Sequence, residues 1–273
     1  MRLKNLKLKI GIIGAGVMGQ IFIDRLLKSK TVNKNQILIN RRSDDKKLLV
    51  NQSQILILAV KPQDFTNLAD EIREFTQAKK PLLVLSIMAG IDVKRIRKLL
   101  GVSAVVRAMP NLPSKIGQGI TVWKRSSQVS QKQKDQARKI LQSLGIEIEV
   151  SQEKMIDLAT AISGSGPAYV FLFQELMTEA AHNLGLSKAL SRQLVIETIR
   201  GAVNLQRELK LDPKILREQV TSKAGTTAAA LQVFEKRQLS EIFKDALQAA
   251  FMRSLEFKKD HDQTGFNQKI GAN

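Results

Sequence analysis

The sequence of 273 residues contains no cysteine and only two histidines. The lack of cysteine excludes a disulfide scaffold, a thiol nucleophile and a cysteine-ligated zinc or iron–sulfur centre, and it fits a reducing cytoplasm, which is the location we expect. His182 falls in an apolar helical stretch and His261 in a polar segment, and neither has a ligand or triad partner at a useful spacing. We therefore expect chemistry that uses no histidine, cysteine or metal.

Long apolar runs and aromatic residues are also scarce. No uninterrupted run reaches about 18 apolar residues, so no membrane span is predicted. Aromatic residues make up 4% of the chain, which leaves little stacking surface for single-stranded nucleic acid. The shares of hydrophobic (43%) and charged (25%) residues are those of an ordinary globular protein. The length suits one large domain or two modest ones.

Positive charge is abundant but unevenly distributed. The formal net charge is +19, and residues 1–152 hold 28 basic and 11 acidic residues, against 16 and 14 in residues 153–273. The basic residues are scattered rather than gathered into one stripe. Nucleic-acid binding is therefore a minor alternative, and a basic half that binds a phosphate-rich small molecule explains the excess as well.

The first half of the chain alternates short apolar runs with helical patterns. Most of the runs are continuous Val/Ile/Leu segments, which is typical of strands covered on both faces. Together they predict an α/β fold, a Rossmann-type, doubly wound and mostly parallel sheet. The predicted strands are 9–13, 36–39, 55–60, 82–87, 104–107, 119–123 and 146–150, and the predicted helices between them are 17–29, 65–77, 93–100 and 131–143.

After Val150 only helical periodicity remains, so we predict a cofactor-binding domain at 1–152 and an all-helical domain at 153–273 that carries substrate and dimerisation functions. Ser187 and Ser240 are predicted helix caps, Gly185 a helix stop, and the tail from Asp260 a loose polar segment. Whether the apolar helices form a private core or a subunit interface stays open. The predicted helices are 155–162, 168–184, 189–209, 213–220, 226–236 and 240–258.

A G-x-G-x-x-G motif follows the first predicted strand and opens the first predicted helix. Its residues are Gly14, Gly16, Val17, Met18 and Gly19, with Ala15 between the first two glycines. In this context the motif predicts a dinucleotide site: Gly14 permits a tight turn, Gly16 lets a pyrophosphate approach the backbone, and Gly19 allows close helix–strand packing. The helix N-terminus then offers free N–H groups to the phosphates.

The end of the second predicted strand indicates which dinucleotide binds. An NAD enzyme usually places a carboxylate there for the ribose 2′-hydroxyl. This chain instead has Asn40, Arg41, Arg42 and Ser43, whose guanidinium groups can pair with a 2′-phosphate. We therefore predict NADP(H), with NAD(H) as a weaker alternative because two aspartates follow closely.

Four further segments stand out: Ala59–Pro62, Arg107–Asn111, Ser163–Tyr169 and Val220–Thr227. With the glycine loop they resemble the Δ1-pyrroline-5-carboxylate reductase family, the last enzyme of proline biosynthesis, and they follow the family's order across nearly the whole chain. The resemblance implies reduction of the imine bond of L-Δ1-pyrroline-5-carboxylate to give L-proline, with hydride from NADPH. It also implies a homodimer at least, or a ring of dimers.

The resemblance further assigns roles in the cofactor half. Ala59, Val60, Lys61 and Pro62 would contact the cofactor, and Met109, Pro110 and Asn111 would lie near the nicotinamide. Arg107 is expected to be a structural ion-pair residue. Ser165, between two glycines, would meet the substrate carboxylate or the nicotinamide amide, although ordinary helix capping is the alternative.

The segment from Ser222 to Thr227 would hold the substrate. By resemblance its backbone N–H groups, including those of Gly225, Thr226 and Thr227, bind the carboxylate, and the Thr227 hydroxyl lies near the imine nitrogen as the catalytic group. This chain departs from the family pattern at Lys223, where proline is usual, and at Ala224, where glycine is usual. Alanine is costly there if the position needs positive φ.

Two other reductase-type interpretations remain open. A two-domain reductase of the 3-hydroxyacid dehydrogenase type would share the architecture, but it commonly carries a lysine on the long helix after the cofactor half, and the predicted helix 168–184 has none. A paralogue that binds NADP(H) without turnover would follow from the altered loop at 223–224. A further departure is the short stretch between Arg42 and Ile55, which predicts a more open adenosine side of the pocket.

Overall fold

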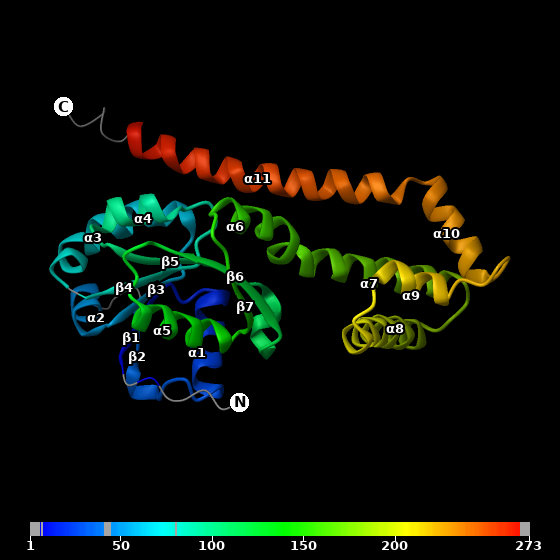
Figure 1. The fold of residues 1–273 in the computed structure, drawn as a ribbon, viewed down its shortest axis with the longest axis horizontal. Coiled ribbons are helices and arrows are strands. Elements are labelled where there is room, and N and C mark those ends of the chain that lie inside the picture. The colour runs from blue at the N-terminus through cyan, green and yellow to red at the C-terminus, as the bar shows by residue number, and fades with distance from the viewer. Residues whose placement is uncertain (1–5, 7, 41–44, 80, 268–273) are drawn as a thin grey trace. The chain divides into compact units, whose positions relative to one another are not determined.

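The computed structural model describes residues 6, 8–40, 45–79 and 81–267, with side chains as far as residue 257 (Figure 1). It divides into two compact units, one made of residues 1–165 with 249–273 and the other of residues 166–248. We call them the first and second units. The predicted boundary at residue 152 stays a prediction.

The first unit contains a seven-stranded sheet, as predicted. Its order is β2-β1-β3-β4-β5-β6-β7, the first five strands are mutually parallel, and β6 runs antiparallel to β5 with β7 parallel to β6. The strands are β1 (Ile10–Ile13), β2 (Ile37–Asn40), β3 (Ile55–Leu58), β4 (Leu83–Ser86), β5 (Ala104–Met109), β6 (Gly119–Arg125) and β7 (Gly145–Glu149).

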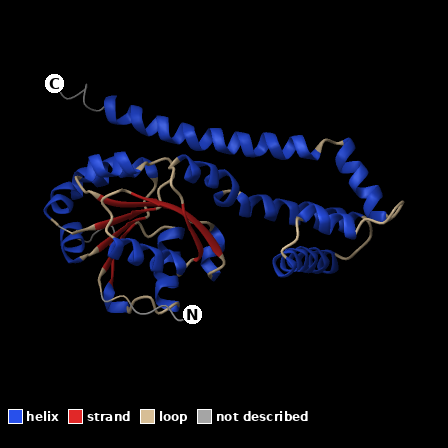
Figure 2. Cartoon of the chain, in the orientation of Figure 1, coloured by secondary structure: helices blue, strands red, loops and turns tan. Residues whose placement is uncertain are grey.

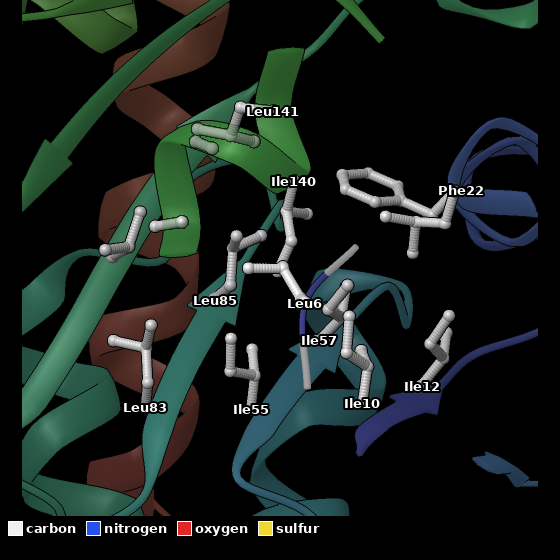
Figure 3. Close-up of a cluster of buried hydrophobic side chains, with 14 of the residues drawn as sticks. Leu6, Ile10, Ile12, Phe22, Ile55, Ile57, Leu83, Leu85, Ile140 and Leu141 are labelled. Atoms are coloured by element: carbon white, nitrogen blue, oxygen red, sulfur yellow. The ribbon is translucent and has the colours of Figure 1, made fainter. Parts of the chain in front are cut away.

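Helices cover both faces of this sheet around β3, which explains why β3 is apolar and buried at every position (Figure 2). Ile55 and Ile57 of β3 join a buried cluster with α1 (Val17–Lys28) and α5 (Gln131–Gln142). Leu56 and Leu58 join a second cluster with α2 (Lys46–Gln52), α3 (Phe65–Ala78) and α4 (Val93–Leu100). Figure 3 shows side chains of the first cluster, with Phe22 of α1 packed toward the strands. Helix α6 (Lys154–Ala159) also belongs to this unit.

Helix α2 was not predicted from the sequence. Its seven residues are too few to show a clear period, and it forms because Asp45 caps it and Leu49 and Val50 bury against the sheet. The Asp45 carboxylate accepts from the N–H groups of Lys47 and Leu48 at 2.8 and 3.3 Å. More than half of the short stretch between Arg42 and Ile55 is thus helical, and the more open adenosine side of the pocket stays a prediction.

Strand β7 carries an ion-pair network on one of its faces. Glu149 accepts from Lys134 of α5 at 2.6 Å and from Arg125 of β6 at 2.9 Å. Burial raises the pKa of the Glu149 carboxyl, but these two cations lower it by more, so that the pKa lies below its ordinary value. Glu147, also in β7, accepts a hydrogen bond at 2.6 Å from the indole N–H of the fully buried Trp123 of β6.

The second unit is helical and has almost no core of its own. Its helices include α7 (Gly166–Asn183), α8 (Lys188–Leu209), α9 (Pro213–Gln219) and α10 (Thr226–Lys236), and in residues 166–248 only Ser191 and Val195 are buried. Ser187 caps α8, and Gly185, with φ of +108°, follows the end of α7, both as predicted. Large apolar side chains are exposed instead, among them Phe171, Leu172, Phe173, Leu176, Leu194, Val203, Phe234 and Phe243.

Helix α11 (Leu239–Asn267) corrects two predictions. It begins at Leu239, so Ser240 lies inside the first turn and does not cap it. It also continues to Asn267, so the segment from Asp260, expected to be loose, is helical over most of its length. His261 falls among residues whose side chains are not described, whereas His182 is an exposed residue of α7, as predicted, with Nδ1 2.8 Å from the Leu186 carbonyl oxygen.

Within the described residues one helical run, Lys154–Asn183, is long and apolar enough to cross a membrane by length and composition, and 17% of its most apolar window is buried. The run was not predicted because polar residues interrupt the apolar ones. A single run of this kind is weak support for a membrane span, and exposed apolar side chains are also what a subunit interface requires.

Candidate active site

The turn after β1 contains glycines at positions where the neighbouring backbone leaves no room for a side chain. Gly14 has φ of +104°, and a Cβ there would clash with the backbone of Ala59 and Val60. A Cβ on Gly19 would clash with the Gly14 carbonyl oxygen. The turn therefore packs tightly against the end of β3, and the conformations predicted for these two positions are confirmed.

Gly16 differs, because no described atom lies within 4 Å of a Cβ placed there. It is the N-cap of α1, with φ −69° and ψ −175°, and no described side chain caps the helix. The first N–H groups of α1 thus have no side-chain cap, and the backbone at Gly16 has free space beside it, which is the arrangement that can receive a pyrophosphate. Val17 is 69% exposed beside this opening, and Met18 packs partly against the core. The residues present thus fit a dinucleotide.

The end of β2 is only partly described. Asn40 is buried at the last position of the strand. Arg41, Arg42 and Ser43, predicted to hold the 2′-phosphate, lie outside the described residues. Asp45 is one of the two aspartates for which NAD(H) was kept as a weaker alternative. Its carboxylate caps α2.

The end of β3 adjoins the glycine turn. The Ala59 N–H donates to the Ile13 carbonyl oxygen at 2.8 Å, so the chain leaves β3 directly beside the end of β1. Val60 is half-buried, Lys61 is exposed, and Pro62 begins the 3₁₀ helix η2 (Pro62–Asp64). These residues lie at the carboxyl edge of the parallel strands, where ligands of open α/β sheets bind.

The segment after β5 is buried and held by its neighbours. Met109 packs with Val122 and Ile156, and Pro110 is also buried. The Asn111 amide oxygen accepts from the Ile120 N–H at 3.0 Å, and its Nδ2 donates to the Ser163 carbonyl oxygen at 3.1 Å. The sequence did not predict these two contacts.

Arg107 is a buried ion-pair residue, as predicted. Its guanidinium donates to Asp157 at 2.6 Å and to Glu153 at 3.2 Å, and its side chain is 1% exposed. Glu153 also accepts from the Val93 N–H, at the start of α4, at 2.9 Å. Neither carboxylate was predicted as a partner of Arg107; their i, i+4 spacing at the start of the helical half was the available signal.

Ser165 follows a π-helical turn, η4 (Thr160–Gly164), rather than an open turn. Its N–H donates to the Thr160 carbonyl oxygen at 2.9 Å and its hydroxyl to the same oxygen at 3.2 Å. Both donors thus have a partner within the chain. Single π turns occur frequently at functional sites, but the predicted ligand role of Ser165 stays a prediction.

The loop before α10 has the strained backbone that the sequence suggested. Ala224 has φ of +57°, in the left-handed region that favours glycine. The Gly225 N–H donates to the Ser222 carbonyl oxygen at 3.1 Å, and a Cβ on Gly225 would clash with the Ser222 hydroxyl oxygen. Gly225 is the N-cap of α10, without a described side-chain cap, so the N–H groups of Thr226 and Thr227 lack intrahelical acceptors.

The structure therefore separates the predicted residues into two sets. The described residues of the predicted cofactor site gather at the carboxyl ends of β1, β2, β3 and β5 in the first unit, which also contains Ser165. Ser222, Gly225, Thr226 and Thr227 belong to the second unit.

Comparisons with known proteins match two family models to different parts of the chain. Residues 153–257 match the family model of pyrroline-5-carboxylate reductase dimerisation, and residues 9–49 match that of NADP oxidoreductase, coenzyme F420-dependent. A pyrroline-5-carboxylate reductase of Synechocystis is 34% identical over 93% of this chain and 100% of its own length. Pyrroline-5-carboxylate reductase 1 of Bacillus subtilis is 34% identical over 94% of this chain and 91% of its own.

Solved structures show the same similarity. The Plasmodium falciparum pyrroline carboxylate reductase with NADP bound superposes with a TM-score of 0.86 at 29% identity, covering 93% of this chain and 99% of its own. A pyrroline-5-carboxylate reductase from Coxiella burnetii gives 0.84 at 33% identity, covering 92% and 99%. With relatives above 30% identity matched along nearly their whole length, this chain belongs to the pyrroline-5-carboxylate reductase family.

Proposed function

We propose that this chain reduces L-Δ1-pyrroline-5-carboxylate to L-proline with NADPH, as an oxidoreductase of proline biosynthesis that acts on a C=N bond. The observation that carries the proposal is the match to reductases of that name along their whole length. The open, uncapped N-terminus of α1 at Gly16 supports it independently, because it fits the pyrophosphate of a dinucleotide.

The cofactor is proposed to be NADP(H), with NAD(H) as a weaker substitute, and when bound it supplies the hydride for the C=N bond. Gly14, Gly16, Val17, Met18 and Gly19 would hold its pyrophosphate through the backbone. The other residues proposed to contact it are Asn40, Arg41, Arg42 and Ser43 at the 2′-phosphate, Ala59, Val60, Lys61 and Pro62 at the edge of the sheet, and Met109 and Pro110 on the nicotinamide side.

The substrate is proposed to bind at the start of α10. Its carboxylate would accept from the free N–H groups of Thr226 and Thr227, where the helix dipole favours an anion. The half-buried Thr227 would donate its hydroxyl hydrogen to the imine nitrogen. A threonine hydroxyl donates a hydrogen bond but is a poor proton source, so a substrate that is already protonated on nitrogen, and therefore electrophilic, suits this site. Ser165 and Ser222 complete the proposed substrate site.

Assembly is proposed to use the second unit. Its apolar helices lack a core of their own, and the dimerisation model covers residues 153–257, so a homodimer through this part of the chain is expected. The domain division at 152/153, a ring of dimers and a cytoplasmic location remain proposals made from the sequence.

The direct test is the initial rate of NADPH and NADH oxidation with Δ1-pyrroline-5-carboxylate. We expect turnover that prefers NADPH, a loss of at least about tenfold in kcat/KM, or about 1.4 kcal/mol, for Thr227→Val, and near-normal activity for Thr227→Ser, which keeps the hydroxyl. Turnover that survives Thr227→Val unchanged would remove the role of Thr227 and leave the enzyme. NADPH binding without turnover would identify a non-catalytic paralogue.

The cofactor site has its own test in the two glycines of the turn. Gly16→Ala places a methyl group in open space and replaces one N-cap residue by a poorer one, so the thermal midpoint should fall by no more than about 4 °C while the KM for NADPH rises at least about tenfold. Gly14→Ala should lower both stability and binding, because its Cβ meets the Ala59 backbone. A Gly16→Ala variant with wild-type KM would contradict the placement of the pyrophosphate.

A further inference from the structure

We propose that Asn111 is a positioning residue. It ties the segment after β5 to the π turn η4 and so keeps both segments in a fixed position beside the proposed nicotinamide site. The proposal rests on the proposed function and departs from the direct cofactor contact that the family resemblance implied for this residue. It follows from what the two ends of the Asn111 amide contact.

Both ends of this amide are engaged by backbone groups from different elements. Oδ1 accepts from the Ile120 N–H of β6 at 3.0 Å, and Nδ2 donates to the Ser163 carbonyl oxygen of η4 at 3.1 Å. The side chain is 9% exposed. Because one partner is a donor and the other an acceptor, only one orientation of the amide satisfies both. Asn111 thus joins three segments with one buried group.

The Ser163 carbonyl needs a donor from outside its own helix because a proline follows four residues later. In an α-helix its partner would be the N–H of the residue four positions on, and that residue is Pro167, which has none. The neighbouring pattern is shifted as well, since the Ser165 N–H donates to the Thr160 carbonyl oxygen in the π geometry. Ser163 is half-buried, and a carbonyl that is shielded from water without a partner is costly, so the Asn111 amide stabilises the turn where proline removes the α-helical donor.

A second contact makes the attachment rigid. Four residues earlier on the same stretch of chain, Arg107 pairs with Asp157 of α6 at 2.6 Å. The segment 153–165 is therefore attached to β5 and its following loop at Glu153, Asp157 and Ser163. These attachments are spread along the segment, so together they limit both its shift and its rotation relative to β5. Met109 lies between Arg107 and Asn111 in the sequence, and its Cγ would be in van der Waals contact with a Cβ placed on Gly164.

The consequence concerns the placement of reacting atoms. Hydride transfer requires donor and acceptor atoms about 3–3.5 Å apart, and a misplacement of about 1 Å costs on the order of 100-fold in rate. Met109 and Pro110 line the proposed nicotinamide side, and their position depends on Asn111. Loss of the tether should thus lower the rate of the chemical step while the binding of the dinucleotide, held mainly at the glycine turn, is preserved.

The test compares three variants of the full-length protein. Asn111→Ala removes both contacts, Asn111→Asp keeps the acceptor for Ile120 but removes the donor to Ser163, and Gln118→Ala removes an exposed amide from the same segment as a control. For each we would measure the Kd of NADP+ by calorimetry, kcat and KM, and the deuterium isotope effect with NADPH labelled at the transferred hydrogen. Hydrogen exchange at the Ile120 amide reports the tether without turnover.

For Asn111→Ala and Asn111→Asp we expect a Kd within about threefold of the wild type, a kcat lowered at least about tenfold and a larger isotope effect. For Gln118→Ala we expect no change in any of the three. Ile120 exchange should accelerate in Asn111→Ala and stay slow in Asn111→Asp. A Kd raised more than tenfold with unchanged kcat would make Asn111 a direct ligand and overturn the proposal, as would unchanged kcat and isotope effect. If the wild type has no turnover, the proposed function fails, while unchanged Ile120 exchange in Asn111→Ala separately refutes the tether.

Discussion

Replacing Arg107 with methionine should be among the most destabilising single changes in the first unit. Its guanidinium is 1% exposed and pairs with Asp157, 5% exposed, at 2.6 Å. Methionine has similar length but no charge, so the Asp157 carboxylate would stay buried without a cation. Removing one partner of a buried pair typically costs about 3–5 kcal/mol, because the remaining charge keeps its desolvation penalty.

The second pairing of Arg107 contributes less to this loss. Glu153 is 23% exposed and retains the hydrogen bond from the Val93 N–H at 2.9 Å, so it keeps part of its solvation and one donor. The loss should therefore come mainly from Asp157. The double variant Arg107→Met/Asp157→Leu, which removes both buried charges, should be close to the wild type, since apolar pairs often replace buried ion pairs at little cost.

The assay is urea unfolding at matched protein concentration, because the stability of an oligomer depends on concentration. The single variant should lose about 3–5 kcal/mol and recover most of it in the double variant, with little effect of 0.5 M salt on the difference. A loss below about 1 kcal/mol, or a double variant as unstable as the single one, would refute the reasoning that a buried, unpaired carboxylate is the cause.

Three further changes test smaller contributions. Because the pKa of Glu149 is lowered in the folded state, the ionised carboxylate stabilises the protein above its unfolded pKa, and this stabilisation is lost as the pH falls through the folded pKa. Glu149→Gln should therefore cost about 0.5–1 kcal/mol at pH 7 and nothing in strong acid. Urea midpoints measured at both pH values test this. Ser187→Ala should cost about 1 kcal/mol by removing the cap of α8, whereas Ser240→Ala, inside the first turn of α11, should be nearly neutral in the same thermal scan; equal losses would contradict the cap assignment. Ala224→Gly should raise the free energy of unfolding by up to about 1 kcal/mol, because relief of the φ of +57° exceeds the added freedom of the unfolded chain, and a lowered thermal midpoint would argue against strain at this position.

Much of the secondary structure could be predicted because it depends on residues close together in the sequence. Helix α4 lies at Val93–Leu100 as predicted, since its apolar residues repeat at the helical period. Strand β3 is apolar throughout because helices cover both its faces. Helix α2 was missed since seven residues show no clear period, and only burial of Leu49 and Val50 against the sheet makes it stable.

By itself the sequence determined the seven strands, most of the helices, the glycine turn at Gly14–Gly19 and the change to an all-helical second half. Each depends on a pattern a few residues long, so chain-local chemistry suffices. Only the tertiary structure decided that Arg107 meets Asp157, 50 residues away, and that Asn111 meets Ser163, 52 residues away. Such partners depend on how the chain returns to the sheet, and no local period encodes which carboxylate or carbonyl will arrive there.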